Sequence, residues 1–276
     1  MAYLMNIGFD NSLRLCRNVY YFEYKGIKYK LIQNNRLKWC DVLLTIITGA
    51  YNKKKNDDAY VVASEFLSAL SWQNGSMIKL RHSGGGGVPD NYKLRNAKPV
   101  IRDFPKIPFI GHHTGYDICT IPKIETEEQR TALILLREAS SSNNEYLSFL
   151  FFWQVLETEK GHASEWIDET YKNNHNKINL YKADIDNISL KGKSLGHYLY
   201  DDCRNTIAHI MRKGGGKRRL ELDTPEENVR ISRCTNIIRA FALFYIENKL
   251  KLQKKMYLVR KNGRGFPTFV DEGDAN

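Results

Sequence analysis

The sequence predicts an α+β protein, in which a mixed α/β domain is followed by an all-α helical bundle. Short segments that alternate between polar and apolar residues, separated by turn residues, dominate the first 124 residues. Longer segments with apolar stripes and helix-capping residues fill residues 125–256, and a proline-rich stretch at 98–122 separates the two regions. We therefore expect domains at 1–124 and 125–256, with a C-terminal tail at 257–276.

The N-terminal region contains one clear hairpin signal. Residues 18–32 alternate around Lys25-Gly26, which predicts two strands joined by a tight turn. Helical spacing predicts helices over 37–48 and 58–71, the second with Asp58 as its N-cap, and a strand over 77–80. The four consecutive glycines within 83–88 predict a mobile surface loop, because no phosphate-loop lysine and Ser/Thr pair follows them.

The C-terminal region is dominated by helix signals. Apolar periodicity predicts helices over 125–139, 143–160, 166–173 and 193–213. The last helix begins at Thr224, with proline at its first position and glutamate at its third, and is expected to run to about residue 255. We expect it to bury seven apolar residues: Ile237, Ile238, Phe241, Leu243, Phe244, Ile246 and Leu250. A bundle of four or five helices would bury these faces together.

Composition limits the classes of function. The 276 residues carry a net charge of +11 with a pI near 9.3, which favours a polyanionic partner such as nucleic acid. Five unpatterned cysteines indicate reduced thiols, and we see neither a signal peptide nor an apolar run long enough for a bilayer. We therefore expect a soluble, cytoplasmic protein without a membrane partner. The adjacent pair His112-His113 is poor ligand spacing, so we expect neither a metal site nor a cofactor.

The residues best suited to chemistry lie between Tyr200 and Met211. At about 100° per residue, one side of the predicted helix is apolar: it carries Leu195, Leu199, Cys203, Thr206, Ile207 and Ile210. A separate polar stripe carries Asp202, Asn205, His209 and Arg212. Arg204 lies roughly 140° around the helix from His209 by the same geometry. One helix alone therefore does not bring Arg204 and His209 together.

These residue types suit the cleavage of RNA. A neutral His209 imidazole can take the proton of a ribose 2′-OH near neutral pH. Arg204 stays cationic and can clamp the scissile phosphate, while Asn205 can orient His209 or donate to a phosphate oxygen. Together these groups can cleave RNA by internal transesterification without a metal.

The spacing of Arg204, Asn205 and His209 resembles the Arg-x(4–6)-His motif of HEPN-domain ribonucleases, in which Asn, Asp or His usually follows the arginine. The resemblance covers residues 125–256, and the HEPN fold is a helical bundle. It implies a homodimer whose two motifs line one cleft, and products with a 2′,3′-cyclic phosphate and a 5′-hydroxyl. It also suggests a toxin or antiphage defence effector. Some HEPN toxins carry a tyrosine two residues after the histidine, where this chain has Met211, so we expect no nucleotidyltransferase antitoxin.

A basic segment follows the motif and surrounds three glycines. Its cations are Arg212, Lys213, Lys217, Arg218 and Arg219. We expect them to bind the phosphate backbone of RNA, because glycines allow close approach and the segment adjoins His209. The same residues could instead complement the dipole at the C-terminal end of the helix.

Two alternatives remain open. The bundle could be a non-catalytic HEPN-like module that binds RNA or a protein through the same basic face. The protein could also be a hydrolase that uses His112-His113 or a cysteine, although the sequence offers no partner residues for either. In the favoured hypothesis, residues 1–124 sense a trigger or position the substrate. The family analogy also suggests an unidentified regulatory protein as a partner.

Overall fold

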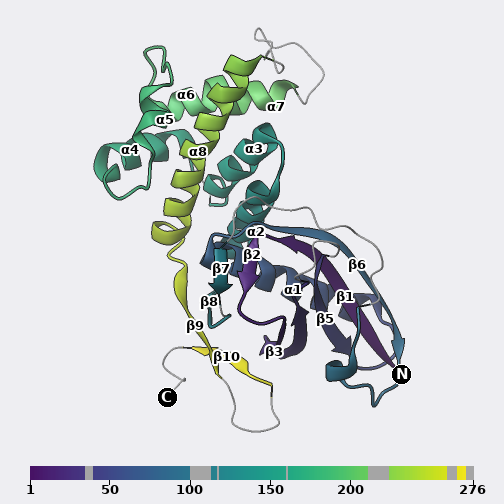
Figure 1. Cartoon of the computed structure of the whole chain (residues 1–276). Coiled ribbons are helices and arrows are strands. Elements are labelled where there is room, and N and C mark those ends of the chain that lie inside the picture. The colour runs from purple at the N-terminus through teal and green to yellow at the C-terminus, as the bar shows by residue number, and fades with distance from the viewer. Residues whose placement is uncertain are drawn as a thin grey trace. The chain divides into compact units, whose positions relative to one another are not determined.

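The computed structural model describes residues 1–34, 40–99, 113–116, 118–159, 161–210, 224–259 and 266–271. The chain divides into two compact units, one formed by Met1–Lys123 with Gln253–Asn276 and the other by Ile124–Leu252. The first unit is built on a mixed sheet and the second is helical (Figure 1), which confirms the predicted α+β class.

A large sheet organises the first unit. Within the described residues, eight strands form it in the order β6-β1-β5-β4-β3-β10-β9-β8. Their bounds are Ala2–Asn11 (β1), Val19–Tyr24 (β3), Ile27–Ile32 (β4), Asp41–Ile47 (β5), Ile78–Val88 (β6), Thr120–Lys123 (β8), Gln253–Val259 (β9) and Thr268–Asp271 (β10). The pairing of β10 with β3 is parallel, and the other pairings in this sheet are antiparallel. Strands β2 (Leu13–Leu15) and β7 (His113–Tyr116) form a separate parallel pair.

The hairpin predicted over residues 18–32 is confirmed. Strands β3 and β4 pair so that Tyr24 lies opposite Ile27. Lys25 and Gly26 between them have φ values of 49° and 75°. Positive φ at both central residues is what a two-residue turn needs to match the twist of its strands. Local sequence alone was sufficient to predict this element.

The helix predicted over residues 37–48 is wrong over its described part, because residues 41–47 form strand β5. This strand lies between β1 and β4. Helix α1 (Lys53–Asn74) contacts it, and Val42 and Leu44 belong to a buried cluster that includes Leu94 of the short helix η1 (Leu94–Asn96). A strand covered on both faces is apolar throughout, so its sequence lacks the alternation that separates strands from helices.

The glycine run predicted as a mobile loop is instead part of β6. Gly85 and Gly86 pair with Met5 and Leu4 of β1. A Cβ atom added at Gly85 would approach ring atoms of Tyr3 to 2.7 Å, which is closer than side-chain packing allows. Gly85 therefore permits a tight strand pairing with a tyrosine ring against the backbone, whereas a Cβ at Gly84 or Gly86 would meet no atom within 4 Å.

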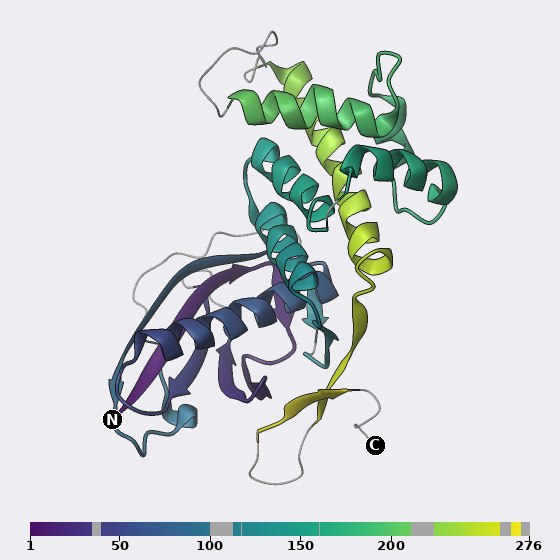
Figure 2. The same ribbon diagram turned by 180° about the vertical axis from the view of Figure 1, so that it is seen from behind.

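Helix α1 supplies the core that the sheet packs against, and Figure 2 shows it lying along the sheet. It begins earlier than predicted, because the side chain of Asn52, and not Asp58, accepts the capping hydrogen bond from Lys55 N at 3.1 Å. The ring of Phe66 stacks on Phe22 with centroids 4.5 Å apart and also meets Phe269. Phe269 belongs to β10, so residues assigned to the 257–276 tail contribute a strand and a buried aromatic side chain to this core.

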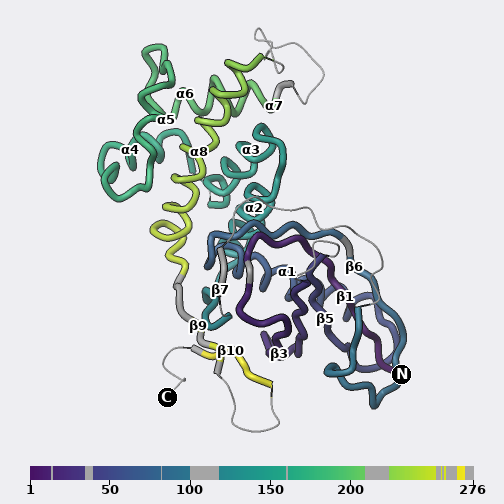
Figure 3. The backbone as a smooth tube through the Cα atoms, viewed as in Figure 1, coloured from purple at the N-terminus to yellow at the C-terminus, as the bar shows by residue number. Residues whose placement is uncertain are grey.

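The second unit is helical throughout its described part. Its helices are α2 (Glu127–Ser141), α3 (Glu145–Leu156), α4 (Ala163–Asn174), α5 (Lys182–Asp186), α6 (Leu195–Tyr198), η2 (Leu199–Asn205), α7 (Thr206–Ile210) and α8 (Pro225–Asn248). Helix α3 packs against both α2 and α8, as the backbone trace in Figure 3 also shows. None of the described helices has both the length and the apolar character that a membrane-spanning segment requires.

The caps of these helices match local sequence signals. Thr126 and Gln129 form a capping box at the start of α2, and the Thr224 side chain caps α8 as predicted. Helix α8 ends at Asn248, before the predicted end near residue 255, because residues 253–259 form strand β9. Four residues of its expected apolar face are buried, namely Ile237, Ile238, Phe241 and Ile246, and Leu250 is buried just after the helix ends. Leu243 and Phe244 are only partly buried and line a cavity of about 630 Å³ beside α5. The turn of α8 that carries them therefore faces partly outward.

The sheet unit should lose stability in alkali. The hydroxyl of buried Tyr24 donates to Glu65 Oε1 at 2.6 Å, and burial raises the pKa of both Tyr24 and Tyr29 above the ordinary value. A phenol whose pKa is higher in the folded state contributes stability that is present below about pH 10 and is lost as the pH rises further. We expect the free energy of unfolding, measured by urea titration, to change little up to about pH 9 and to fall as the pH rises beyond about 10.

The matched variants are Tyr24→Phe and Tyr51→Phe. Tyr24→Phe removes one buried phenol and should reduce the loss of unfolding free energy at high pH. Tyr51→Phe should leave that loss unchanged, because Tyr51 is 58% exposed. Equal pH dependence in the parent and in Tyr24→Phe would contradict this explanation.

Candidate functional site: the motif helix

The motif residues lie on one continuous helix made of α6, η2 and α7, which spans residues 195–210. The predicted helix over 193–213 is therefore confirmed within its described part. Its central segment, η2, is π-helical, and the hydroxyl of Thr206 donates to the carbonyl of Asp201, five residues earlier, at 3.0 Å. A π-helix has a wider turn than an α-helix. The angular positions expected from 100° per residue therefore do not hold through Leu199–Asn205.

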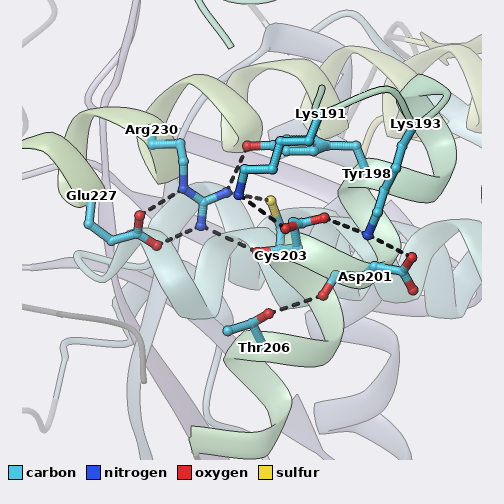
Figure 4. Close-up of polar contacts among 9 residues, drawn as sticks. Lys191, Lys193, Tyr198, Asp201, Cys203, Thr206, Glu227 and Arg230 are labelled. Carbon is cyan, nitrogen blue, oxygen red and sulfur yellow. Dashed lines mark hydrogen bonds and ion pairs between the residues drawn. The ribbon is translucent and has the colours of Figure 1, made fainter. Parts of the chain in front are cut away.

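Asp202 is the clearest correction. Helical periodicity predicts that it shares a polar stripe with Asn205 and His209, but it is buried, with 3% of its surface exposed. Its carboxylate accepts from Lys193 Nζ at 2.7 Å and lies 3.4 Å from Lys191 Nζ, and Lys193 also contacts Asp201 (Figure 4). Two lysines that precede the helix thus neutralise an acid that is buried about two turns into it.

Arg230 of α8 joins the motif helix to the rest of the bundle. Its Nε and Nη2 donate to the two carboxylate oxygens of Glu227 at 2.7 and 2.5 Å. Its Nη1 donates to the Tyr198 hydroxyl at 3.0 Å and to Cys203 Sγ at 3.3 Å, and Nη2 also donates to the Asp202 carbonyl at 3.3 Å (Figure 4). A single guanidinium thus binds groups from α6, η2 and α8 in the fork geometry that arginine favours.

The thiols of Cys203 and Cys234 meet beside this guanidinium, and both side chains are fully buried. The hydrogen bond from Cys234 lowers the pKa of Cys203, and the charge of Arg230 lowers it further. The same bond, together with burial, raises the pKa of Cys234. The sequence analysis gave these cysteines no role, because the contact joins residues of different helices.

A second cluster fixes the start of the motif helix. Asp168 of α4 accepts from the backbone N–H of Gly196 at 2.7 Å and from the Ser194 hydroxyl at 2.6 Å. His197 Nδ1 lies 3.1 Å from the Asp168 carboxylate and 2.9 Å from Ser194 Oγ. A Ser-His-Asp relay needs the two different ring nitrogens for serine and aspartate. Since both contacts use one nitrogen and the serine proton goes to Asp168, the cluster caps the helix and does not activate Ser194.

Arg204 lies on the outer side of the helix and is partly exposed. Its Nη1 donates to Asn205 Oδ1 at 3.2 Å, and its Nη2 lies 3.7 Å from Glu157 Oε1. The guanidinium carbon is 5.8 Å from the centroid of the Tyr200 ring. The two adjacent motif residues are thus in direct contact, and a carboxylate from the end of α3 joins them. Glu157 was not singled out in the sequence, where it is one acid among many.

The other predicted site residues cannot be placed in this way. The backbone of His209 continues the helix in α7, but its side chain is outside the described residues, as are Arg212, Lys213, Lys217, Arg218 and Arg219. His112 is also outside them, and His113 is described only as a backbone position in β7. Over the part of the chain that is described, no group of three or more His, Cys, Asp or Glu side chains is arranged to hold a metal ion.

Removing the Arg230 side chain should loosen the motif helix. Arg230→Ala removes the bidentate partner of the Glu227 carboxylate and the hydrogen bonds to Tyr198 and to the Asp202 carbonyl, so we expect the free energy of unfolding to fall by about 2 kcal/mol or more. The free energy of unfolding of Arg230→Lys should lie between those of the parent and Arg230→Ala, because lysine keeps the positive charge but lacks the planar, forked set of N–H donors. Arg233→Ala is the matched control, since Arg233 makes one hydrogen bond, to the Asn187 carbonyl at 3.1 Å. Equal urea midpoints for Arg230→Ala and Arg233→Ala would show that Arg230 is not the anchor.

Comparison with known proteins gives one family match. The model of the methylamine utilization protein MauJ family matches residues 132–247, which lie within the helical unit and make up less than half of the chain. No curated protein and no solved structure matches the chain. MauJ-like proteins are HEPN-like. The helical unit is therefore similar to a HEPN-like family. The matched residues include Arg204 and His209, but the match shows neither an Arg-x(4–6)-His motif nor an activity.

Proposed function

We propose that the protein is a metal-independent endoribonuclease that acts in the cytoplasm as a homodimer. The observation that carries this proposal is the position of Arg204, which is partly exposed, in contact with Asn205 and on the same continuous helix as His209. An arginine that keeps donors open to solvent can receive a phosphate. The net charge of +11 supports a polyanionic substrate.

The proposed reaction needs only side chains and the substrate's own hydroxyl. His209 takes the proton of the ribose 2′-OH, and the 2′-oxygen attacks the adjacent phosphorus. The bond from the 2′-oxygen to phosphorus forms as the bond to the 5′-oxygen breaks. The departing 5′-oxygen takes a proton from water, and His209 returns its proton to water afterwards. Arg204 stabilises the charge that develops on the phosphate oxygens. The products are a 2′,3′-cyclic phosphate and a 5′-hydroxyl.

The homodimer follows from the number of motifs. The chain contains one Arg-x(4–6)-His motif, and a C2 pair is the usual way to bring two identical helices face to face. In this arrangement the two motifs line one cleft, as the HEPN resemblance implies. A role as a toxin or antiphage defence effector, with an unidentified regulatory protein as a further partner, is the setting that the same resemblance suggests.

The second candidate is a non-catalytic HEPN-like module that binds RNA or a protein. One observation favours it: Arg204 faces the carboxylate of Glu157, which partly neutralises the guanidinium and so weakens its ability to stabilise charge in a transition state. The two candidates differ in one measurable respect, because binding by a non-catalytic module should survive substitution of His209.

Arg204 and His209 should act as a unit. Purified protein incubated with total RNA in EDTA should cleave it, and Arg204→Ala and His209→Ala should each reduce the rate about 10²-fold or more. The double variant should lose little beyond the worse single variant, because both groups act on one transition state. Asn205→Ala should cost less. A requirement for metal, or a His209→Ala protein that melts well below the parent, would contradict the proposal.

The basic segment should bind RNA without taking part in catalysis. Replacing Lys217, Arg218 and Arg219 by alanine should weaken RNA affinity and flatten its dependence on salt, since fewer counterions are released. Turnover at saturating RNA should change little. Anisotropy titrations over a range of salt, combined with saturation kinetics, measure both quantities. A fall in saturating turnover as large as in His209→Ala would place the segment in the catalytic machinery.

A further inference from the structure

Glu157 is anchored to the core of the helical unit by contacts that do not involve the motif helix. It follows the last residue of α3, and its backbone N–H donates to the Gln154 carbonyl at 3.1 Å. Its Oε1 accepts from the indole Nε1 of Trp153 at 2.7 Å. Trp153 is 1% exposed, and its ring stacks on Phe149 at 6.3 Å between centroids. The Glu157 carboxylate is therefore held by a residue that cannot move without disturbing the core.

The same carboxylate oxygen faces Arg204. The separation of 3.7 Å between Nη2 and Oε1 is an ion pair and too long for a hydrogen bond. The side chains of Arg204 and Glu157 are 34% and 37% exposed, so water screens the pair and breaking it costs little. Tyr200 completes the enclosure, because its ring lies 5.8 Å from Trp153 and 5.8 Å from the Arg204 guanidinium.

We propose that Glu157 is a positioning residue that orients the Arg204 guanidinium toward the scissile phosphate of an RNA substrate. A guanidinium has five N–H donors, and the contacts with Asn205 and Glu157 leave others open for a phosphate. Glu157 and Asn205 approach Arg204 from different helices and so restrict its rotation. Because the ion pair is weak, a phosphate can shift Arg204 without a large loss. This inference rests on the proposed ribonuclease function.

Positioning has a distinctive kinetic signature. A misplaced catalytic group lowers the rate at saturating substrate, because its stabilising interaction with the transition state is weakened. Removing a carboxylate beside the phosphate site should at the same time tighten ground-state binding of a polyanion, since one repulsive charge is gone. A residue needed only for folding would not produce these two opposite changes.

The chain offers a closely matched control. Glu159, two residues later, lies 3.7 Å from Lys249 Nζ, and its side chain is 39% exposed. Glu159→Ala thus removes the same type of side chain from an ion pair of the same length in the same segment, but away from Arg204. Glu157→Gln is the conservative variant, because an amide oxygen can still accept from the Trp153 indole and face Arg204.

The experiment measures kcat on a cleavable RNA, and affinity for a 2′-O-methyl RNA of the same sequence, for the full-length parent and the three variants. All are compared at a temperature at which circular dichroism shows them folded. We expect Glu157→Ala to lower kcat about tenfold or more while binding the 2′-O-methyl RNA no more weakly than the parent. Glu157→Gln should recover much of the lost kcat, and Glu159→Ala should keep the parental value.

The outcomes separate the two proposals. If the parent cleaves RNA and Glu157→Ala retains the kcat of Glu159→Ala, the positioning role is wrong and the ribonuclease proposal stands. A kcat loss that Glu157→Gln does not relieve, or that accompanies weaker binding of the 2′-O-methyl RNA, also overturns positioning through this contact. If the parent does not cleave RNA, both proposals fail.

Discussion

The helical unit depends on the guanidinium of Arg230, which binds three segments at once. Its carboxylate partner, Glu227, lies one turn earlier on α8, while Tyr198, Cys203 and the Asp202 carbonyl belong to the motif helix. The side chain is 23% exposed, so these bonds form in a partly desolvated place where an unpaired charge would be costly. The position of Arg204, the next residue after Cys203, follows from this attachment.

Two further contacts complete the support of the motif helix. Asp168 of α4 holds its first residues through Gly196, and Glu157 after α3 meets its outer side at Arg204. The helix is thus held at its start by α4 and along its length by α8, and the residue after α3 adds a weaker, partly exposed ion pair at Arg204. Catalytic groups need such support, because the rate is sensitive to small errors in their placement. The π-helical segment between these contacts is consistent with a helix adapted to local packing.

The sheet unit shows a different balance between local and distant causes. Its aromatic core joins Phe22 and Phe66 from the first part of the chain to Phe269 from β10 near the C-terminus. Such a contact cannot be read from periodicity, because the segment around Phe269 is short, follows glycines and a proline, and resembles a tail. The segment is recognisable as a strand only once it pairs with β3.

The sequence by itself determined the features that short segments encode. These are the α+β class, the turn at Lys25-Gly26, the Thr224 cap and the presence of Arg204 and Asn205 together on a helix. Each depends on backbone preferences or on hydrogen bonds between near neighbours.

Only the tertiary structure decided the features that depend on distant partners. Residues 41–47 are a strand because β1 and β4 flank them, and the glycines of β6 are needed where the Tyr3 ring lies against the backbone. Asp202 is buried because a π-helical turn directs it toward two lysines, and Glu157 meets Arg204 because α3 ends beside the motif helix. The physical reason is the same in each case: burial and ion pairing are set by which segments pack together, and packing is a property of the whole chain.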